Sequence, residues 1–281
     1  MADEDEIFLF GATSLIGWNL LRLAGSRRIV PFCNRHAKRL PERAWRRLNF
    51  EDEAGLREAF RHARPRRLFY CAAVCDIEKC EAAPEWATII NVDAVERLLR
   101  HIPDPTRLIY CSSDHVFSGD TGPYTEHSQP DPISVYGQTR VAAEALVRER
   151  RGDSLIIRCG LVIGPSADGR SGHLDWLRYR AREGLPITIV KGESRSAAYA
   201  ANLIPRLLAL AEAGITGLRH IPATPAVSRV VLADYLNERF GLNASIQTEQ
   251  RADRRTPHLG NVDLRTIHDD DLSRPLPPVV R

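Results

Sequence analysis

Short apolar runs alternate along this chain with longer segments that have the residue spacing of amphipathic helices. The runs have the length of strands: IFLF (7–10), IVPFC (29–33), RLNF (47–50), RLFYC (67–71), RLIYC (107–111) and LIIRCG (155–160). Helices are expected from about Leu15, around Tyr136, and near 53–62, 85–101, 172–184 and 197–213. Repeated strand–helix–strand units make the strands parallel and place helices on both faces. The sequence therefore predicts an α/β fold with a doubly wound parallel sheet.

The length of 281 residues allows one large α/β domain with a smaller annex. The alternation becomes irregular after about residue 160, where Gly160, Gly164 and Pro165 mark the point at which the chain leaves the core. We therefore expect a Rossmann domain and a small C-terminal substrate-binding annex that closes over a cleft. The Rossmann domain takes residues 1–160 and further core elements near 197–225, and the annex takes 161–196 and 226–281.

The composition is that of an ordinary globular protein, with 43% hydrophobic and 27% charged residues. A net charge of +3 favours neither a nucleic-acid nor a membrane partner, and no apolar run approaches the ~20 residues of a membrane span. The N-terminus is acidic, unlike a signal peptide, so we expect a cytoplasmic protein. The spacing of the six cysteines fits no common metal site, and buried thiols are expected. A homodimer is left open.

The stretch GATSLIG follows the first expected strand and opens the first helix. Gly11 would let the chain turn tightly, and Gly17 would allow close packing of helix and strand. The helix start offers free N–H groups and a positive dipole end, which suit a dinucleotide pyrophosphate. The expected cofactor-binding residues of this loop are Gly11, Thr13, Ser14, Leu15, Ile16 and Gly17. The alternative is a purely structural turn.

The end of the second strand, CNRH, lies beside the adenosine ribose in folds of this type. An acidic residue there would hold the two ribose hydroxyls of NAD, and this sequence has none. Asn34, Arg35, Lys38 and Arg39 stand there instead, so NADP(H) is favoured over NAD(H). The alternative is a solvated arginine, because only three of the 39 basic residues in this chain are lysines.

Three segments resemble the extended short-chain dehydrogenase/reductases, most of all the dTDP-4-dehydrorhamnose reductase branch. They are CSSDHVFSGDTGPYTEHSQPDPISVYGQTRVAAEALV (111–147), CAAVCDIEKCEAAPEWATIINVDAVERLL (71–99) and TGLRHIPATPAVSRVVLADYL (216–236). The resemblance implies NAD(P)H-dependent reduction of a keto group on a nucleotide sugar. The regulatory β subunit of methionine adenosyltransferase resembles the same branch, so a cofactor-binding but catalytically degenerate protein is the alternative.

The resemblance also implies roles for single residues. Ser113 matches the hydroxyl residue that hydrogen-bonds the substrate carbonyl, and Tyr136 matches the proton donor. Arg140 stands where the family has the lysine that holds the nicotinamide ribose and lowers the tyrosine pKa. Further matches line the cofactor: Ala72 and Ala73 as a backbone wall, and Asn91 as the helix asparagine near the lysine.

The sequence departs from the family pattern mainly around the expected substrate. Ser14 replaces a loop glycine, and His115 replaces a tyrosine that follows the serine motif. Arg195 replaces a glycine in GESRSAA (192–198) and could serve a substrate diphosphate. His115 could contact substrate or pack at a strand end. Glu126 could reach the active site or be a solvated loop acid.

Arg140 stands four residues after Tyr136, on the same face of a helix. A guanidinium can lower the pKa of a phenol and can hold ribose hydroxyls, but it does not give up a proton at working pH. Arg140 therefore predicts a slower reductase that needs another proton route. The retained Ser113 and Tyr136 favour catalysis, whereas Arg140 and the altered 192–198 segment favour the regulatory alternative.

Overall fold

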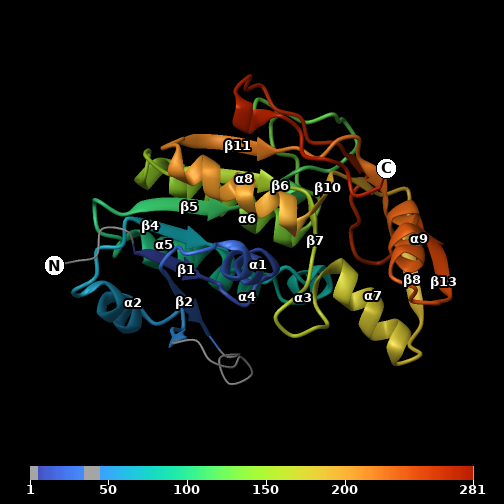
Figure 1. The fold of residues 1–281 in the computed structure, drawn as a ribbon, viewed down its shortest axis with the longest axis horizontal. Coiled ribbons are helices and arrows are strands. Elements are labelled where there is room, and N and C mark those ends of the chain that lie inside the picture. The colour runs from blue at the N-terminus through green and yellow to red at the C-terminus, as the bar shows by residue number, and fades with distance from the viewer. Residues whose placement is uncertain (1–5, 35–44, 281) are drawn as a thin grey trace.

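The computed structural model describes residues 6–34 and 45–280. Seven strands form one parallel sheet in the order β11-β6-β5-β4-β1-β2-β3 (Figure 1). Their bounds are Ile7–Phe10 (β1), Ile29–Cys33 (β2), Arg46–Arg47 (β3), Arg67–Tyr70 (β4), Arg107–Cys111 (β5), Leu155–Cys159 (β6) and Gly217–Ile221 (β11). The order reverses direction between β1 and β4, which is where ligands bind in doubly wound sheets. The predicted Rossmann-like fold is confirmed.

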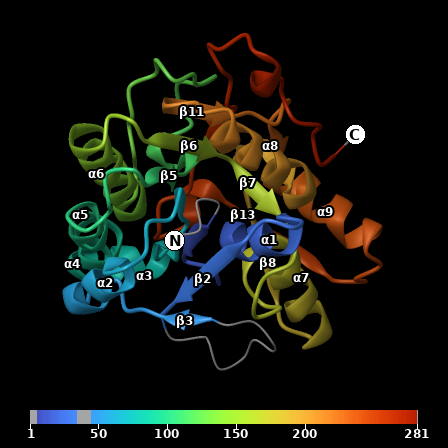
Figure 2. The same cartoon turned by 60° about the vertical axis from the view of Figure 1, so that its left-hand side comes forward.

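Helices cover both faces of this sheet, and Figure 2 shows the two groups on opposite sides. On one face, α1 (Leu15–Leu23) and α8 (Ala200–Glu212) pack on β1, β5 and β6. On the other face, α2 (Glu53–Phe60), α5 (Ala94–Leu99) and α6 (Val135–Arg150) bury aromatic and aliphatic residues of β1, β4 and β5. Apolar side chains therefore cover the central strands on both faces, as a parallel sheet requires.

The register of the central strands aligns their carboxyl ends. Phe10 pairs with Tyr70, and Tyr70 pairs with Tyr110, so the residues that follow these three positions are aligned with one another. Gly11, Cys71 and Cys111 thus lie at one edge, which carries the loop to α1 and the segments that contain Ala72 and Ser113. Within the described ranges, no helix combines the length and apolarity needed to cross a bilayer.

A third core lies beside this edge and is built from later segments (Figure 1). It joins α7 (Gly172–Arg182), α9 (Arg229–Arg239), and the paired strands β8 (Ile187–Lys191) and β13 (Ile246–Gln250). Short strands connect it to the sheet: β7 (Leu161–Ile163), β9 (Ser194–Arg195), β10 (Ala197–Tyr199), β12 (Val227–Ser228) and β14 (Asn261–Val262). We call the segments 161–199 and 226–280 the annex.

The structure corrects several expected elements. The helix expected near 85–101 is divided into α4 (Pro84–Thr88), a π-helix (Ile89–Asp93) and α5, and a separate α3 (Ile77–Ala82) precedes them. The strand expected at 47–50 is β3 at Arg46–Arg47. Helix α8 begins at Ala200 because residues 197–199 pair with β7 as β10.

Candidate active site

Two glycines build the turn between β1 and α1. Gly11 has a φ of +78°, and a Cβ there would lie 2.4 Å from the backbone nitrogen of Ala72. A Cβ on Gly17 would lie 2.3 Å from the carbonyl oxygen of Gly11. Both positions therefore require glycine for steric reasons. The turn brings the start of α1 against the loop after β4, at the point where the strand order reverses.

Ser14 replaces the usual glycine and caps α1. Its Oγ accepts a hydrogen bond of 3.1 Å from the backbone N–H of Gly17. Thr13, Leu15 and Ile16 are only partly buried, so the start of the helix is accessible. This glycine cradle fits the pyrophosphate of a dinucleotide, whose negative charge the helix N-terminus stabilises. Ser14 uses one of the free N–H groups itself, so the backbone offers one donor fewer than in an uncapped helix.

Helix α6 carries Tyr136 and Arg140 to the same edge. Ser134 caps it by accepting a hydrogen bond of 3.1 Å from Gly137 N. A Cβ on Gly137 would lie 2.2 Å from the carbonyl oxygen of His115, so this glycine lets the first turn of α6 press against the segment after β5. The close approach places Tyr136 beside Ser113.

The Tyr136 phenol is held protonated in the resting protein. Burial raises its pKa to about 12, although the charge of Arg140 and a hydrogen bond with the Ser113 hydroxyl act in the lowering direction. Only 7% of the tyrosine is exposed. Tyr136, Ser113 and Arg140 thus form one group, in which a neutral phenol stands between a hydroxyl and a fixed cation.

Arg140 lies beneath this edge and is 2% exposed. Its Nη2 donates to the carbonyl oxygen of Cys111, and its guanidinium stands 4.7 Å from the centre of the Tyr110 ring. Its Nε and Nη1 are buried and have no hydrogen-bond partner among the described residues. Two unpaired cationic donors fit the hydroxyls of a ribose. In this conformation, however, they are shielded, so the charge acts on Tyr136 while a ribose contact would require the side chain to turn.

Asn91 connects the loop after β4 to α6. It lies in the π-helix, where its amide accepts from Val74 N at 2.8 Å and donates to Val74 O at 2.9 Å and Thr139 Oγ1 at 3.0 Å. A π-helical turn often accompanies a functional site. Asn91 therefore fixes Val74, which directly follows the expected cofactor wall of Ala72 and Ala73.

Arg195 has a different setting from the open diphosphate contact that the sequence suggested. It is 4% exposed, and its Nε donates to Asp114 Oδ2 at 2.6 Å while its Nη2 donates to Oδ1. Its Nη1 donates to Glu193 Oε1 at 3.1 Å. Glu193 also accepts from Arg229 at 3.1 Å and lies 3.2 Å from a ring nitrogen of His258. We call Asp114, Glu193, Arg195 and Arg229 the annex ion network.

His115 lies between Tyr136 and the annex ion network. Its ring meets the Tyr136 ring edge-on at a centroid distance of 5.3 Å. Burial, together with the charge of Arg195, lowers its pKa to about 4. His115 is therefore a neutral imidazole at neutral pH, and its Nδ1 has no partner in the described part of the chain.

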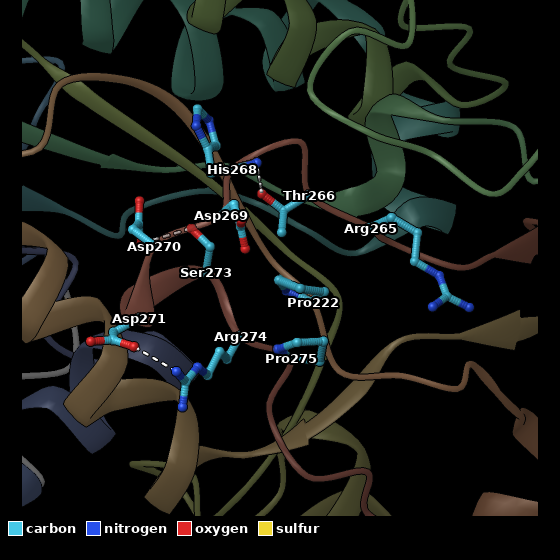
Figure 3. Close-up of a pocket in the computed structure, with 10 residues that line it drawn as sticks. All are labelled: Pro222, Arg265, Thr266, His268, Asp269, Asp270, Asp271, Ser273, Arg274 and Pro275. Carbon is cyan, nitrogen blue, oxygen red and sulfur yellow. Dashed lines mark hydrogen bonds and ion pairs between the residues drawn. The ribbon is translucent and has the colours of Figure 1, made fainter.

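Glu126 binds the C-terminal segment. Its carboxylate accepts from His220 N at 2.8 Å, from Thr266 Oγ1 at 2.8 Å and from Ile267 N at 2.9 Å. Thr266 also lines a cavity of about 340 Å³ between Pro222 and residues 265–275 (Figure 3). Two of the acids there are paired, Asp270 with Ser273 and Arg219, and Asp271 with Arg274. The interactions of Glu126 are thus those of a structural clamp.

Arg35, with Lys38 and Arg39, lies outside the described residues. Arg158 is paired with Glu144 inside the protein, at 2.9 and 2.6 Å, and Glu144 also accepts from Ser112 at 2.5 Å. Sequence reasoning did not single out Asp114, Glu193, Arg229 or Glu144. The only available signal was an acid, Asp114, directly after Ser113 in the serine motif.

Comparison with known proteins assigns the family. The family described as RmlD substrate binding domain matches residues 5–259. This chain belongs to that family. A probable low-salt glycan biosynthesis reductase, Agl14 of Haloferax volcanii, is 31% identical over 63% of this chain and 60% of its own length. Methionine adenosyltransferase 2 subunit beta of Xenopus tropicalis is 33% identical over 42% of this chain and 35% of its own length. Both matches span less than two thirds of these relatives.

Solved structures share the fold over almost the whole chain. A hypothetical dTDP-4-dehydrorhamnose reductase from Sulfolobus tokodaii superposes with a TM-score of 0.79 at 25% identity, covering 95% of this chain and 96% of that chain. A dTDP-4-dehydrorhamnose reductase from Bacillus anthracis, solved in complex with NADP, has a TM-score of 0.78 at 18% identity, covering 98% and 95%. The predicted resemblance to this branch of the extended short-chain dehydrogenase/reductases is confirmed.

Proposed function

We propose that this protein reduces a keto group on a nucleotide-sugar substrate with a nicotinamide cofactor. The observation that carries this proposal is the grouping of Ser113, Tyr136 and the Arg140 charge at the sheet edge, next to the glycine cradle. A relative named as a reductase and the family assignment support it. The substrate class comes from the dTDP-4-dehydrorhamnose reductases that share the fold.

In the proposed reaction, Ser113, Tyr136 and Arg140 each have one role. The Ser113 hydroxyl donates a hydrogen bond to the keto oxygen and so orients the carbonyl. Tyr136 delivers its phenolic proton to the same oxygen as negative charge develops there. The cofactor, when bound, supplies the hydride that the carbonyl carbon accepts. Arg140 stabilises the tyrosinate that remains, and solvent restores the phenolic proton because a guanidinium does not.

We propose NADP(H) as the preferred cofactor, because the end of β2 offers no acidic residue and is followed by Arg35. A cationic side chain there suits a 2′-phosphate. Titration with NADPH and with NADH measures the preference, and equal affinities would remove this part of the proposal.

The test of the function is NADPH oxidation in the presence of a panel of 4-keto nucleotide sugars. Tyr136→Phe should lower kcat by about 10²- to 10⁴-fold, because the proton donor is lost. Its NADPH affinity should stay close to that of the wild type, since the phenol contributes little to ground-state binding. Tyr179→Phe, on α7, is the matched control and should keep full turnover. A Tyr136→Phe variant as active as the wild type would exclude the tyrosine mechanism.

A second function is favoured by the placement of Arg140 and by the similarity to methionine adenosyltransferase 2 subunit beta. Under this alternative, the chain binds a nucleotide and acts as a regulatory subunit without turnover. The shielded guanidinium of Arg140 supports it, because its free nitrogens do not face open solvent. NADPH binding by a wild type that reduces no member of the panel would favour this alternative.

A further inference from the structure

Arg195 links the annex to the residue next to Ser113. It donates from Nε and Nη2 to the two carboxylate oxygens of Asp114, and the partners lie 81 residues apart in the sequence. The carboxylate of Asp114 is fully buried, and the side chain of Arg195 is 5% exposed. A bidentate pair of this kind fixes both the position and the charge of the carboxylate.

The same carboxylate faces Ser113. The Ser113 hydroxyl donates to Asp114 Oδ1 at 3.3 Å, and its oxygen accepts from the backbone N–H of His115 at 3.2 Å. A serine hydroxyl has one proton. While that proton is directed at Asp114, it cannot be donated to a substrate carbonyl. Asp114 therefore competes for this hydrogen with the substrate, and also with the oxygen of Tyr136, which the same hydroxyl faces.

The charge on Asp114 also acts on Tyr136. Several groups face this phenol: Arg140 from α6, Cys75 from the loop after β4, and Ser113, Asp114 and His115 from the segment after β5. Burial is the largest cause of the raised pKa of Tyr136, and Asp114 acts in the same direction. The neighbouring guanidinium of Arg195 weakens this effect, because its positive charge offsets the negative charge of the Asp114 carboxylate.

We propose that Arg195 is a positioning residue for the reduction: by neutralising Asp114, it releases the Ser113 hydroxyl proton for the substrate keto oxygen. Without Arg195, Asp114 would be an unpaired buried carboxylate, which is a stronger acceptor and would retain that proton. The annex thus contributes to catalysis through a carboxylate that touches the active serine. This inference rests on the proposed reductase function.

The experiment compares Arg195→Gln, Arg195→Lys and the double variant Asp114→Asn/Arg195→Gln in the NADPH oxidation assay. Arg195→Gln should lower kcat by about 10- to 100-fold, since removing one donor to a developing oxyanion costs about 10²- to 10³-fold. The basic limb of its pH profile should move up by about one unit, because a like charge disfavours the tyrosinate. Arg195→Lys keeps a cation on Asp114 but loses the bidentate contact, so its kcat should lie between those of Arg195→Gln and the wild type.

The double variant separates this role from folding. It removes the competing carboxylate together with its partner, so kcat should return to within about threefold of the wild type, even where Arg195→Gln alone folds poorly. Arg229→Gln is the graded control, because this guanidinium hydrogen-bonds Glu193 and interacts with Asp114 only through its charge. Its basic limb should move much less than that of Arg195→Gln.

The outcomes distinguish this inference from the function on which it rests. A wild type that turns over while Arg195→Gln keeps its kcat and its pH profile would overturn the positioning role alone. A double variant as impaired as Arg195→Gln would also overturn it, because the ion pair itself would then be required. A wild type that reduces no keto sugar would remove the proposed function and this inference together.

Discussion

Two buried arginines approach the same sheet edge from opposite sides, and the protein compensates their charges differently. Arg140, on the cofactor side, gives one hydrogen bond to a backbone carbonyl and stacks on Tyr110, with two nitrogens unpaired among the described residues. Arg195, on the annex side, donates from three nitrogens to two carboxylates. The charge of Arg140 is therefore not neutralised by an ion pair and acts on Tyr136. The charge of Arg195 is neutralised by Asp114 and Glu193.

The difference separates two uses of a buried cation. Burying a charge that has no ion-pair partner costs free energy. Such a charge is retained where it stabilises another charge during the reaction. A compensated charge fixes geometry, because breaking the pair would leave a buried ion without a partner. On this reasoning, Arg140 on the cofactor side supplies an electrostatic field at Tyr136. Arg195 on the annex side holds its carboxylate partners in position.

Stability measurements test the difference between the two arginines most directly. Arg195→Met should lower the free energy of unfolding by about 3–5 kcal/mol, because Asp114 and Glu193 lose a shared partner inside the protein. Arg140→Met should change it by only about 1 kcal/mol or less, because it abandons no carboxylate and loses one hydrogen bond. Urea unfolding of both variants measures the difference. Equal losses would show that the two cations are compensated alike.

The sequence predicted the cofactor side better than the annex side. The sheet and the glycine cradle follow from local patterns, an apolar run and a glycine turn, and the pairing of Ser113 with Tyr136 follows from the family resemblance. In the structure, the steric contacts of Gly11, Gly17 and Gly137 explain why these short motifs hold their shape.

The pairing of Arg195 could not be predicted in the same way. Its partner Asp114 lies in a distant segment, and a buried arginine has the same local signature as an exposed one. The expectation of an open diphosphate contact came from a replaced glycine, and only packing shows which residues the new side chain contacts. The π-helix around Asn91 was missed for a similar reason, because one inserted residue hardly changes the apolar periodicity of a helix.

His115, between the two regions, should make stability depend on acid. Its pKa of about 4 in the folded protein lies below the ordinary value of 6.5. The unfolded chain therefore binds the proton more readily, and stability present above pH 6.5 is lost as the pH falls from 6.5 to 4. The slope should be at most about 1.4 kcal/mol per pH unit for this group.

Urea unfolding at pH 7.0 and pH 5.0 measures this slope. His220, with a pKa also near 4, and His173 contribute in the same direction, so His115→Gln should reduce the slope without abolishing it. Exposed His62→Gln is the control and should leave the slope unchanged. A slope in His115→Gln equal to that of the wild type would show that the imidazole is not kept neutral by its position.

The smallest expected effect comes from Arg140→Lys. Lysine keeps the cation near Tyr136 and can exchange its proton, so it restores a relay that a guanidinium lacks. It loses the cation–π contact of the guanidinium with the Tyr110 ring, so the positive charge is held less firmly in place. We expect kcat to stay level or to rise by up to about tenfold, measured by NADPH oxidation.

The two readings of Arg140 differ in this variant. If Arg140 acts only as a charge, Arg140→Lys keeps or raises turnover, and Tyr136→Phe remains inactive in the lysine background. If the guanidinium holds the site through Cys111 and Tyr110, kcat falls by more than tenfold, and the proposal that Arg140 supplies a field is wrong. Should the protein be regulatory, neither form reduces substrate, and the substitution changes NADPH affinity alone. Because Arg140 forms no ion pair with a carboxylate among the described residues, any loss of kcat in this variant reflects the reaction and not a broken ion pair.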